Sequence, residues 1–154
     1  MRLALADSIA TEAAGAHLGP LLPAGEMVIY LQGDLGAGKT TLVRGLLQAL
    51  GHVGRVPSPT YTLVEPYSLG KLELKHLDLY RIADPEELAY LGIRDMGGIL
   101  LVEWPEKGVH FLPPPDLVCR LDTAPPGRVL EAEGKTEAGR ALCRAWGSAA
   151  GLKS

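Results

Sequence analysis

The chain has 154 residues, of which 47% are hydrophobic and 21% are charged, so it has room for one domain with a real core and not for two. Its formal net charge of −3 at pH 7 argues against a basic surface that holds nucleic acid by counterion release. Apolar stretches are interrupted by Gly and Pro, and the N-terminus lacks the apolar region of a signal peptide. We therefore expect a cytoplasmic protein with no membrane partner.

The first predicted element is a helix that begins at Ser8, as its N-cap, and ends near Leu22, between two prolines. Residues 27–32 then form a continuous apolar run and predict a buried strand. A second helix is predicted over residues 39–50, with an apolar stripe on one face and Gly51 directly after it.

Between that strand and that helix lies Gly-Asp-Leu-Gly-Ala-Gly-Lys-Thr, residues 33–40, which satisfies the Walker A or phosphate-loop pattern. Glycines let backbone N–H groups turn around a phosphate, Lys39 supplies a cation for the β- and γ-phosphates, and the Thr40 hydroxyl can ligate Mg²⁺. The pattern therefore predicts nucleoside triphosphate binding. The expected contacts with the nucleotide come from Asp34, Leu35, Gly36, Ala37, Gly38, Lys39, Thr40 and Thr41.

A β-hairpin is predicted downstream, with strands over residues 60–67 and 71–80 around a turn at Ser68-Leu69-Gly70. It is preceded by Pro57-Ser58-Pro59-Thr60-Tyr61, a stiff segment whose two hydroxyls are placed to face the γ-phosphate. A proline-rich turn before a strand is the other interpretation of this segment.

The remaining elements follow in order. Asp84-Pro85-Glu86-Glu87 is typical of a helix start, and the apolar run 99–102 is typical of a central strand. Residues 117–121 and 128–132 are predicted as edge strands, and residues 136–149 as a closing amphipathic helix. Together these elements predict an α/β fold of the P-loop NTPase type. The chain would be a single P-loop ATPase domain over residues 1–154, built on a mixed sheet flanked by helices. We expect its core to span roughly residues 5–133 and to be followed by the C-terminal helix.

Two acidic residues are candidates for the carboxylate that a phosphate loop needs for its metal. Glu103 ends the apolar run 99–102, and Asp78 lies on the same strand face as apolar neighbours, where a carboxylate must be paired or metal-bound. We assign Glu103 to Mg²⁺, together with Thr40, and Asp78 to a supporting or water-orienting role, and the exchange of these two roles remains open. The competing interpretations are an ion pair between Asp78 and Arg81 and a solvent-exposed Glu103 at the end of its strand.

His76 is the histidine that comes nearest to these acids in the predicted strand, and we expect a packed, hydrogen-bonded side chain rather than a catalytic one.

With these motifs together, the chain resembles the TsaE family, bacterial ATPases of tRNA threonylcarbamoyladenosine biosynthesis. The resemblance is close over roughly residues 25–108 and looser beyond Pro115. The matching segments are GDLGAGKTT at 33–41, SPTY at 58–61, HLDLYR at 76–81, Glu87-Leu88 with Leu91-Gly92-Ile93, and EW at 103–104.

The resemblance implies an ATPase that uses ATP and Mg²⁺ and works with the TsaB and TsaD proteins, resetting their complex between turnovers and reaching tRNA only through it. It also implies that Thr60 lies near the γ-phosphate, that Asp78 supports catalysis and that Trp104 buttresses the site. A weaker part of the resemblance implies that Thr11 and Arg128 contact the nucleotide. For Arg128, a solvated position on the surface is the alternative.

Three other classes of nucleotide-binding protein are alternatives to an ATPase. A GTPase of the Ras type needs an Asn in its guanine-reading motif, and this chain contains no Asn, which favours ATP. A small-molecule kinase usually carries an arginine-bearing lid, whereas the arginines here are scattered. A nucleotide-gated binding module with negligible turnover would differ from an ATPase in releasing no phosphate when its partners are added.

Overall fold

Seven strands form one sheet in the order β1-β7-β6-β2-β5-β4-β3 in the computed structural model, which describes residues 1–151. The strands are β1 Arg2–Leu5, β2 Met27–Gln32, β3 Val64–Leu69, β4 Leu72–Asp78, β5 Ile99–Glu103, β6 Leu117–Ala124 and β7 Gly127–Gly134. The α-helices are α1 Ser8–Leu18, α2 Lys39–Ala49, α3 Glu87–Tyr90 and α4 Glu137–Ala149. Short 3₁₀ turns are η1 Gly19–Leu21, η2 Ile93–Asp95, η3 Pro105–Lys107 and η4 Val109–Phe111.

The four central strands, β6, β2, β5 and β4, run parallel, and antiparallel strands complete the sheet on both sides. Strand β5 is buried along its whole length, as expected for a parallel strand with both faces covered. Because parallel strands end at the same edge of a sheet, the residues that follow β2, β4 and β5 meet there.

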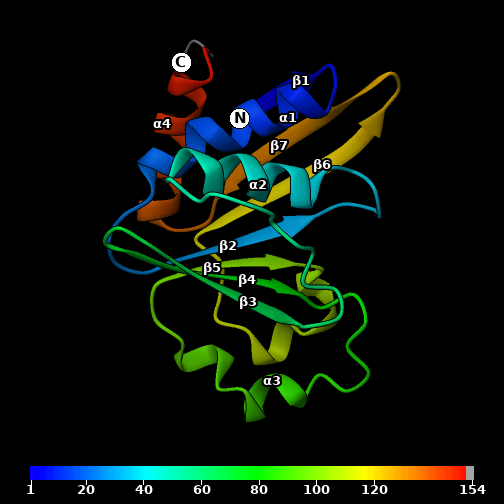
Figure 1. Cartoon of the computed structure of the whole chain (residues 1–154), viewed down its shortest axis with the longest axis vertical. Helices are drawn as coiled ribbons and strands as arrows, with labels where there is room; N and C mark the ends of the chain where they lie inside the picture. Colours follow the sequence, from blue (N-terminus) through cyan, green and yellow to red (C-terminus); the bar gives the residue numbers. More distant parts are fainter. Residues whose placement is uncertain (152–154) are drawn as a thin grey trace.

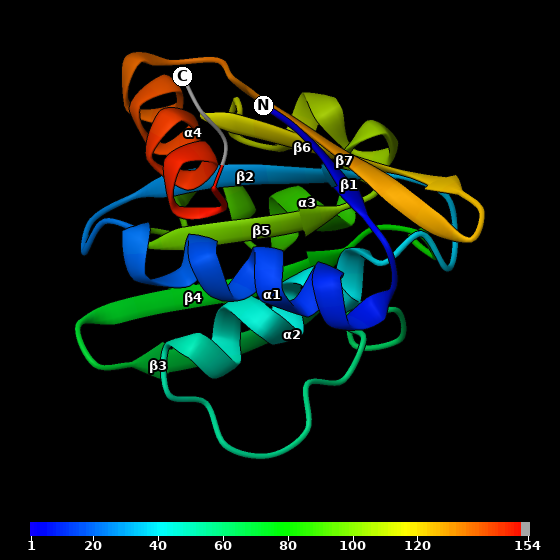
Figure 2. The same ribbon diagram turned by 90° about the horizontal axis from the view of Figure 1, so that it is seen from above.

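Helices α1, α2 and α4 cover one face of the sheet (Figures 1 and 2). Helices α1 and α2 pack backbone against backbone through two glycines. A Cβ atom built on Gly15 would lie 2.0 Å from the Leu42 carbonyl oxygen, and one on Gly45 would lie 2.0 Å from the Glu12 carbonyl oxygen. The helix that follows the phosphate loop is therefore held at a distance that excludes any larger side chain at these two positions.

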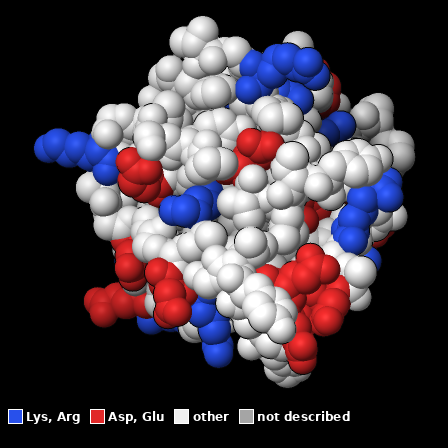
Figure 3. All heavy atoms as spheres, turned by 60° about the horizontal axis from the view of Figure 1, so that its bottom comes forward, with Lys and Arg blue, Asp and Glu red and all other residues white. Residues whose placement is uncertain are grey.

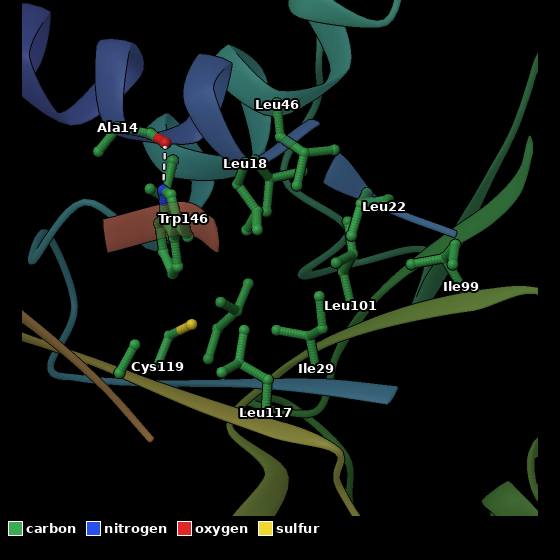
Figure 4. Close-up of a cluster of buried hydrophobic side chains, with 14 of the residues drawn as sticks. Ala14, Leu18, Leu22, Ile29, Leu46, Ile99, Leu101, Leu117, Cys119 and Trp146 are labelled. Atoms are coloured by element: carbon green, nitrogen blue, oxygen red, sulfur yellow. Dashed lines mark hydrogen bonds between the residues drawn. The ribbon is translucent and has the colours of Figure 1, made fainter. Parts of the chain in front are cut away.

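Trp146 fastens α4 to this layer. Its side chain has no exposed surface and its Nε1 donates a hydrogen bond of 2.9 Å to the Ala14 carbonyl oxygen in α1. The close-up in Figure 4 shows the indole above Cys119, on the helix side of the sheet. The last helix thus belongs to the same core as the first.

The opposite face is covered by the short helix α3 and the 3₁₀ turns η2, η3 and η4 (Figure 1). They pack a second core around buried side chains from strands β2, β4 and β5 and from these connections. Its buried residues are Tyr30, Leu77, Leu79, Leu88, Ile93, Leu100, Val102 and Leu112.

The α/β fold with a mixed sheet and flanking helices is confirmed, as are the phosphate-loop strand and helix, the hairpin, the strand that ends at Glu103 and the last helix. Three details differ. Asp7, not Ser8, is the N-cap of α1, because its carboxylate accepts a hydrogen bond from the Ala10 amide. Strand β3 begins at Val64, since residues 59–63 form turns, and α3 is a single turn that begins at Glu87.

The two C-terminal strands were wrongly predicted as edges. Strand β6 lies between β7 and β2, and β7 lies between β6 and β1, a short strand absent from the predicted elements. Strand β1 pairs with residues 128–131 of β7, so its partner is more than a hundred residues away in the chain. No helix within residues 1–151 is long and apolar enough to cross a membrane.

Candidate functional site

The phosphate loop connects the carboxyl end of β2 to the first residue of α2, which is Lys39. Gly38 precedes the helix with φ 110° and ψ 15°, a left-handed conformation that favours glycine. A Cβ there would also lie 2.5 Å from Arg128 Nη1. Since Gly38 offers no side-chain cap to the first amides of α2, these remain available to a ligand, and the helix dipole favours an anion there.

Lys39 is only 5% exposed, and its ammonium lies over the ring of Trp104. It donates a hydrogen bond to the Gly33 carbonyl oxygen, and its Nζ lies 4.0 Å from the centre of the Trp104 ring. Burial lowers the pKa of Lys39 below its ordinary value, and the carboxylates of Glu103 and Asp78 act in the opposite direction. The cation is thus partly desolvated and close to two carboxylates. An incoming phosphate would give it a stronger partner than a carbonyl oxygen.

Trp104 has a left-handed backbone, with φ 57° and ψ 48°, directly after strand β5 ends. Its ring also packs against Tyr80, with 5.0 Å between the ring centres. For a large side chain this conformation costs about 1–2 kcal/mol, so the surrounding contacts must hold it.

Glu103 is buried, at 3% exposure, and does not behave as a surface acid at a strand end. Its Oε2 accepts a hydrogen bond of 3.1 Å from the Thr40 hydroxyl and one of 2.6 Å from His76 Nε2. The first residues of α2 and the ends of β4 and β5 are therefore joined by side-chain hydrogen bonds.

Asp78 lies directly opposite Glu103 in the register of β4 and β5. Its Oδ2 accepts a hydrogen bond of 3.0 Å from the Thr60 hydroxyl, and its Oδ1 accepts one of 2.9 Å from the Tyr80 amide. Ser58 Oγ lies 2.7 Å from Thr60 Oγ1. Arg81 stacks on the Tyr61 ring, 4.7 Å from its centre, and forms no ion pair with Asp78 in the part of the chain that the structure describes.

Several of the residues described above border one cavity of about 360 Å³, which lies between the phosphate loop and the carboxyl ends of β4 and β5. Ten of the residues predicted for the site are among those that line it. They are Leu35, Gly36, Gly38, Lys39, Thr40, Thr41, Thr60, Asp78, Glu103 and Arg128. Ser58 and Trp104, which the sequence placed close to the site, line it as well.

Three residues predicted to contact the nucleotide are not among those that line the cavity. Thr11 has no exposed surface, its hydroxyl donates to the Asp7 carbonyl oxygen at 3.0 Å, and its methyl group packs beneath Gly38. Ala37 is also fully buried. Asp34 is exposed, and its carbonyl oxygen accepts a hydrogen bond of 3.1 Å from the Ala37 amide within the loop. The Thr11 side chain therefore supports the loop from behind rather than facing the cavity.

The cavity wall is chemically suited to a triphosphate and a small divalent cation. It offers the cations of Lys39 and Arg128, an uncapped helix start, several hydroxyls and two carboxylates. A Thr40 hydroxyl that donates its proton to Glu103 keeps its oxygen lone pairs, and hydroxyl and carboxylate oxygens are the donors that Mg²⁺ prefers. Within residues 1–151 no group of three or more His, Cys, Asp or Glu residues could hold a metal alone. This matches the usual Mg²⁺ site, in which one or two protein ligands act with phosphate oxygens and water.

Two features of the site go beyond the sequence prediction. Ser8, predicted as a helix cap, also lines the cavity. The packed, hydrogen-bonded side chain expected for His76 is confirmed, and its partner is Glu103, the carboxylate assigned to the metal. The signal for His76 was its position: it shares a strand face with Asp78, two residues away. The contact with Glu103 itself depends on the pairing of β4 with β5, which the sequence does not state.

Comparison with known proteins agrees with this geometry. The family model described as threonylcarbamoyl adenosine biosynthesis protein TsaE matches residues 5–130. A Haemophilus influenzae protein named tRNA threonylcarbamoyladenosine biosynthesis protein TsaE is 49% identical over 123 residues, which cover 78% of this chain and 78% of that protein. A protein of the same name from Synechocystis is 47% identical over 114 residues, covering 70% of this chain and 71% of its own.

The crystal structure of Bacillus subtilis YdiB superposes with a TM-score of 0.76 at 28% sequence identity. The match covers 96% of this chain and 94% of that one, so the two proteins share the whole fold. The family model spans most of the chain, and the two relatives, which are 49% and 47% identical to it, carry the same family name. The chain belongs to the TsaE family.

Proposed function

We propose that this protein binds and hydrolyses ATP with Mg²⁺, and that this hydrolysis serves threonylcarbamoyladenosine formation in tRNA by acting on a complex of TsaB and TsaD. The relatives are named for threonylcarbamoyladenosine biosynthesis in tRNA. The ATP and magnesium requirements are inferred from the site, and the two partners from the family resemblance.

One observation carries the proposal. A phosphate-loop lysine, a hydroxyl hydrogen-bonded to a buried glutamate, and a second hydroxyl hydrogen-bonded to a buried aspartate all border the same cavity. Binding of a phosphate would explain why the Lys39 cation is buried with so few partners. A soluble fold has little other reason to bury these charged groups around an open space.

In the proposed reaction a water oxygen forms a bond to the γ-phosphorus while the bond to the β,γ-bridging oxygen breaks, which yields ADP and inorganic phosphate. Lys39 stabilises the charge that develops on the phosphate oxygens. Thr60 and Asp78 would hold the attacking water, and Asp78 would accept its proton, because both line the cavity and are hydrogen-bonded to each other. Glu103 and Thr40 would hold Mg²⁺, which neutralises phosphate charge when it is bound.

The surface charge supports an indirect role for tRNA. On the face shown in Figure 3, Lys and Arg groups stand apart from one another with Asp and Glu groups between them. Together with a formal net charge of −3, this favours a partner as the tRNA-holding component.

The proposal is tested by phosphate release from ATP and Mg²⁺, measured for the protein alone and after addition of TsaB and TsaD. We expect slow release alone and a marked increase with the partners. The matched variant is Lys39→Ala, which should lower ATP affinity about 10- to 100-fold because it deletes a charge-assisted phosphate contact. Unchanged ATP binding by this variant in calorimetry would contradict the loop assignment.

Other results would select another function. Nucleotide-dependent binding to TsaB and TsaD without phosphate release would identify a gated binding module. A phosphorylated small molecule in place of inorganic phosphate would identify a kinase. Either result would overturn the proposed hydrolysis.

A further inference from the structure

His76 is fully buried in strand β4, and the only hydrogen-bond partner of its side chain within residues 1–151 is Glu103, a residue of the site. Its Nε2 lies 2.6 Å from Glu103 Oε2, and the neighbouring strands fix the approach: His76 pairs in register with Leu101, two residues before Glu103. The imidazole is therefore placed by the sheet itself and cannot follow a moving carboxylate.

The second ring nitrogen determines where the proton lies. Nδ1 is buried and has no hydrogen-bond partner among the residues that the structure describes. A proton on Nδ1 would be a buried donor without an acceptor, which is unfavourable, whereas a proton on Nε2 is donated to a carboxylate. The geometry thus favours a proton on Nε2, where it is donated to Glu103.

Both donors to Glu103 reach the same oxygen. Thr40 Oγ1 and His76 Nε2 donate to Oε2, while Oε1 accepts no hydrogen bond from any described side chain or amide. Glu103 also lines the cavity. Two fixed donors at one oxygen restrict the rotation of the carboxylate and leave the other oxygen for a ligand.

We propose that His76 is a positioning residue: its Nε2–H holds Glu103 so that Oε1 is ready to bind the divalent cation that accompanies the nucleotide. The inference rests on the proposed function, because it assigns His76 to the cation site of that reaction. Residues that orient a metal ligand in this way typically change metal affinity 10- to 100-fold when they are replaced.

The test compares three variants that differ in where they place a donor. His76→Gln keeps an N–H donor at about the same distance from Cα as Nε2. His76→Asn places the donor at about the same distance from Cα as Nδ1, and His76→Leu has no side-chain donor. Calorimetry measures ATP affinity with Mg²⁺ and in the presence of a chelator for each variant. Thermal unfolding shows whether each one is folded.

We expect all folded variants to bind metal-free ATP like the parent protein. His76→Asn and His76→Leu should lose about 10-fold or more of the Mg²⁺-dependent gain in affinity, and His76→Gln should retain most of it. The proposal would be overturned if Mg²⁺ raised the ATP affinity of all three variants by the same factor. It would also be overturned if a variant lost the same factor in ATP affinity with and without Mg²⁺, because a role of the ring in packing alone would explain that result.

The tautomer gives a second readout that needs no variant and no ligand. Nitrogen-15 NMR of the parent protein should show a proton on Nε2 of His76. An Nε2 without a proton would overturn the proposal. Neither measurement depends on hydrolysis. If TsaB and TsaD elicit no phosphate release while the magnesium comparison holds, the proposed function fails and the role of His76 stands.

Discussion

The two sides of the cavity are built in different ways. On the phosphate-loop side, β2 and α2 are backed by α1, and the helices touch through their backbones at Gly15 and Gly45. On the side of Asp78, the wall is held by hydrogen bonds between side chains, Thr60 to Asp78 and Ser58 to Thr60, in a segment of turns. One side is fixed by main-chain packing, and the other can rearrange by rotating a few side chains.

This difference would suit the proposed function. A rigid phosphate loop would bind the phosphates without reorganising, so its electrostatic contribution would be available at once. A wall of exchangeable hydrogen bonds can respond when the terminal phosphate is present or absent. Replacements on the rigid side should therefore lower stability, and replacements on the other side should change turnover.

The largest effect is expected for Gly45→Ala. Its Cβ would lie 2.0 Å from the Glu12 carbonyl oxygen, and both helices would have to separate. We expect a loss of about 3 kcal/mol in the free energy of unfolding, measured with denaturant, although alanine is the better helix former. Gly25→Ala is the control, because a Cβ there meets no atom within 4 Å. Equal stabilities of the two variants would show that the helices are not held by this contact.

An intermediate effect is expected for Thr60→Val, which keeps the shape of the side chain and removes the hydrogen bond to Asp78. We expect about a tenfold loss of ATP turnover in the presence of TsaB and TsaD, with ATP affinity nearly unchanged, since the lysine and the loop are untouched. Thr60→Ser restores the hydroxyl and should recover turnover. A loss of affinity in place of turnover would assign Thr60 to ground-state binding.

The smallest effect is expected for Arg81→Ala, which removes the stacking of an exposed guanidinium on Tyr61, itself 83% exposed. An exposed cation–π pair contributes about 0.5–1 kcal/mol at most, and surface replacements usually stay near 0.5 kcal/mol. Thermal unfolding should therefore barely change. A loss comparable to that of Gly45→Ala would mean that the turn segment is part of the rigid frame and that the two sides do not differ.

Much of the cradle could be predicted because its signals are local. The glycines, Lys39 and Thr40 follow one another, and the apolar run before Glu103 marks a buried strand without reference to any partner. The motif SPTY marked Thr60 in the same way. For these elements the neighbouring residues in the chain carry the information.

The parts that were missed depend on contacts between distant segments. Strand β1 is four residues long and is recognisable as a strand only by its pairing with β7, so the sequence alone does not show that β7 is an inner strand. The inner position of β6 depends in the same way on its pairing with the distant strand β2. Asp78 binds Thr60 rather than its near neighbour Arg81, since the turns after Pro59 bring the hydroxyl back to the end of β4. Asp7 competes with Ser8 for the same helix start, and residue preferences do not separate two good caps.

The order of strands in the sheet also has a consequence for synthesis. Strand β2 lies between β5 and β6, both of which follow it by more than sixty residues. At about 5–20 residues per second, the ribosome needs roughly 4 to 20 seconds after β2 to complete both neighbours. During that interval an apolar strand with two unpaired edges can join other nascent chains, so a brief association with a molecular chaperone would protect the strand that leads into the proposed nucleotide site.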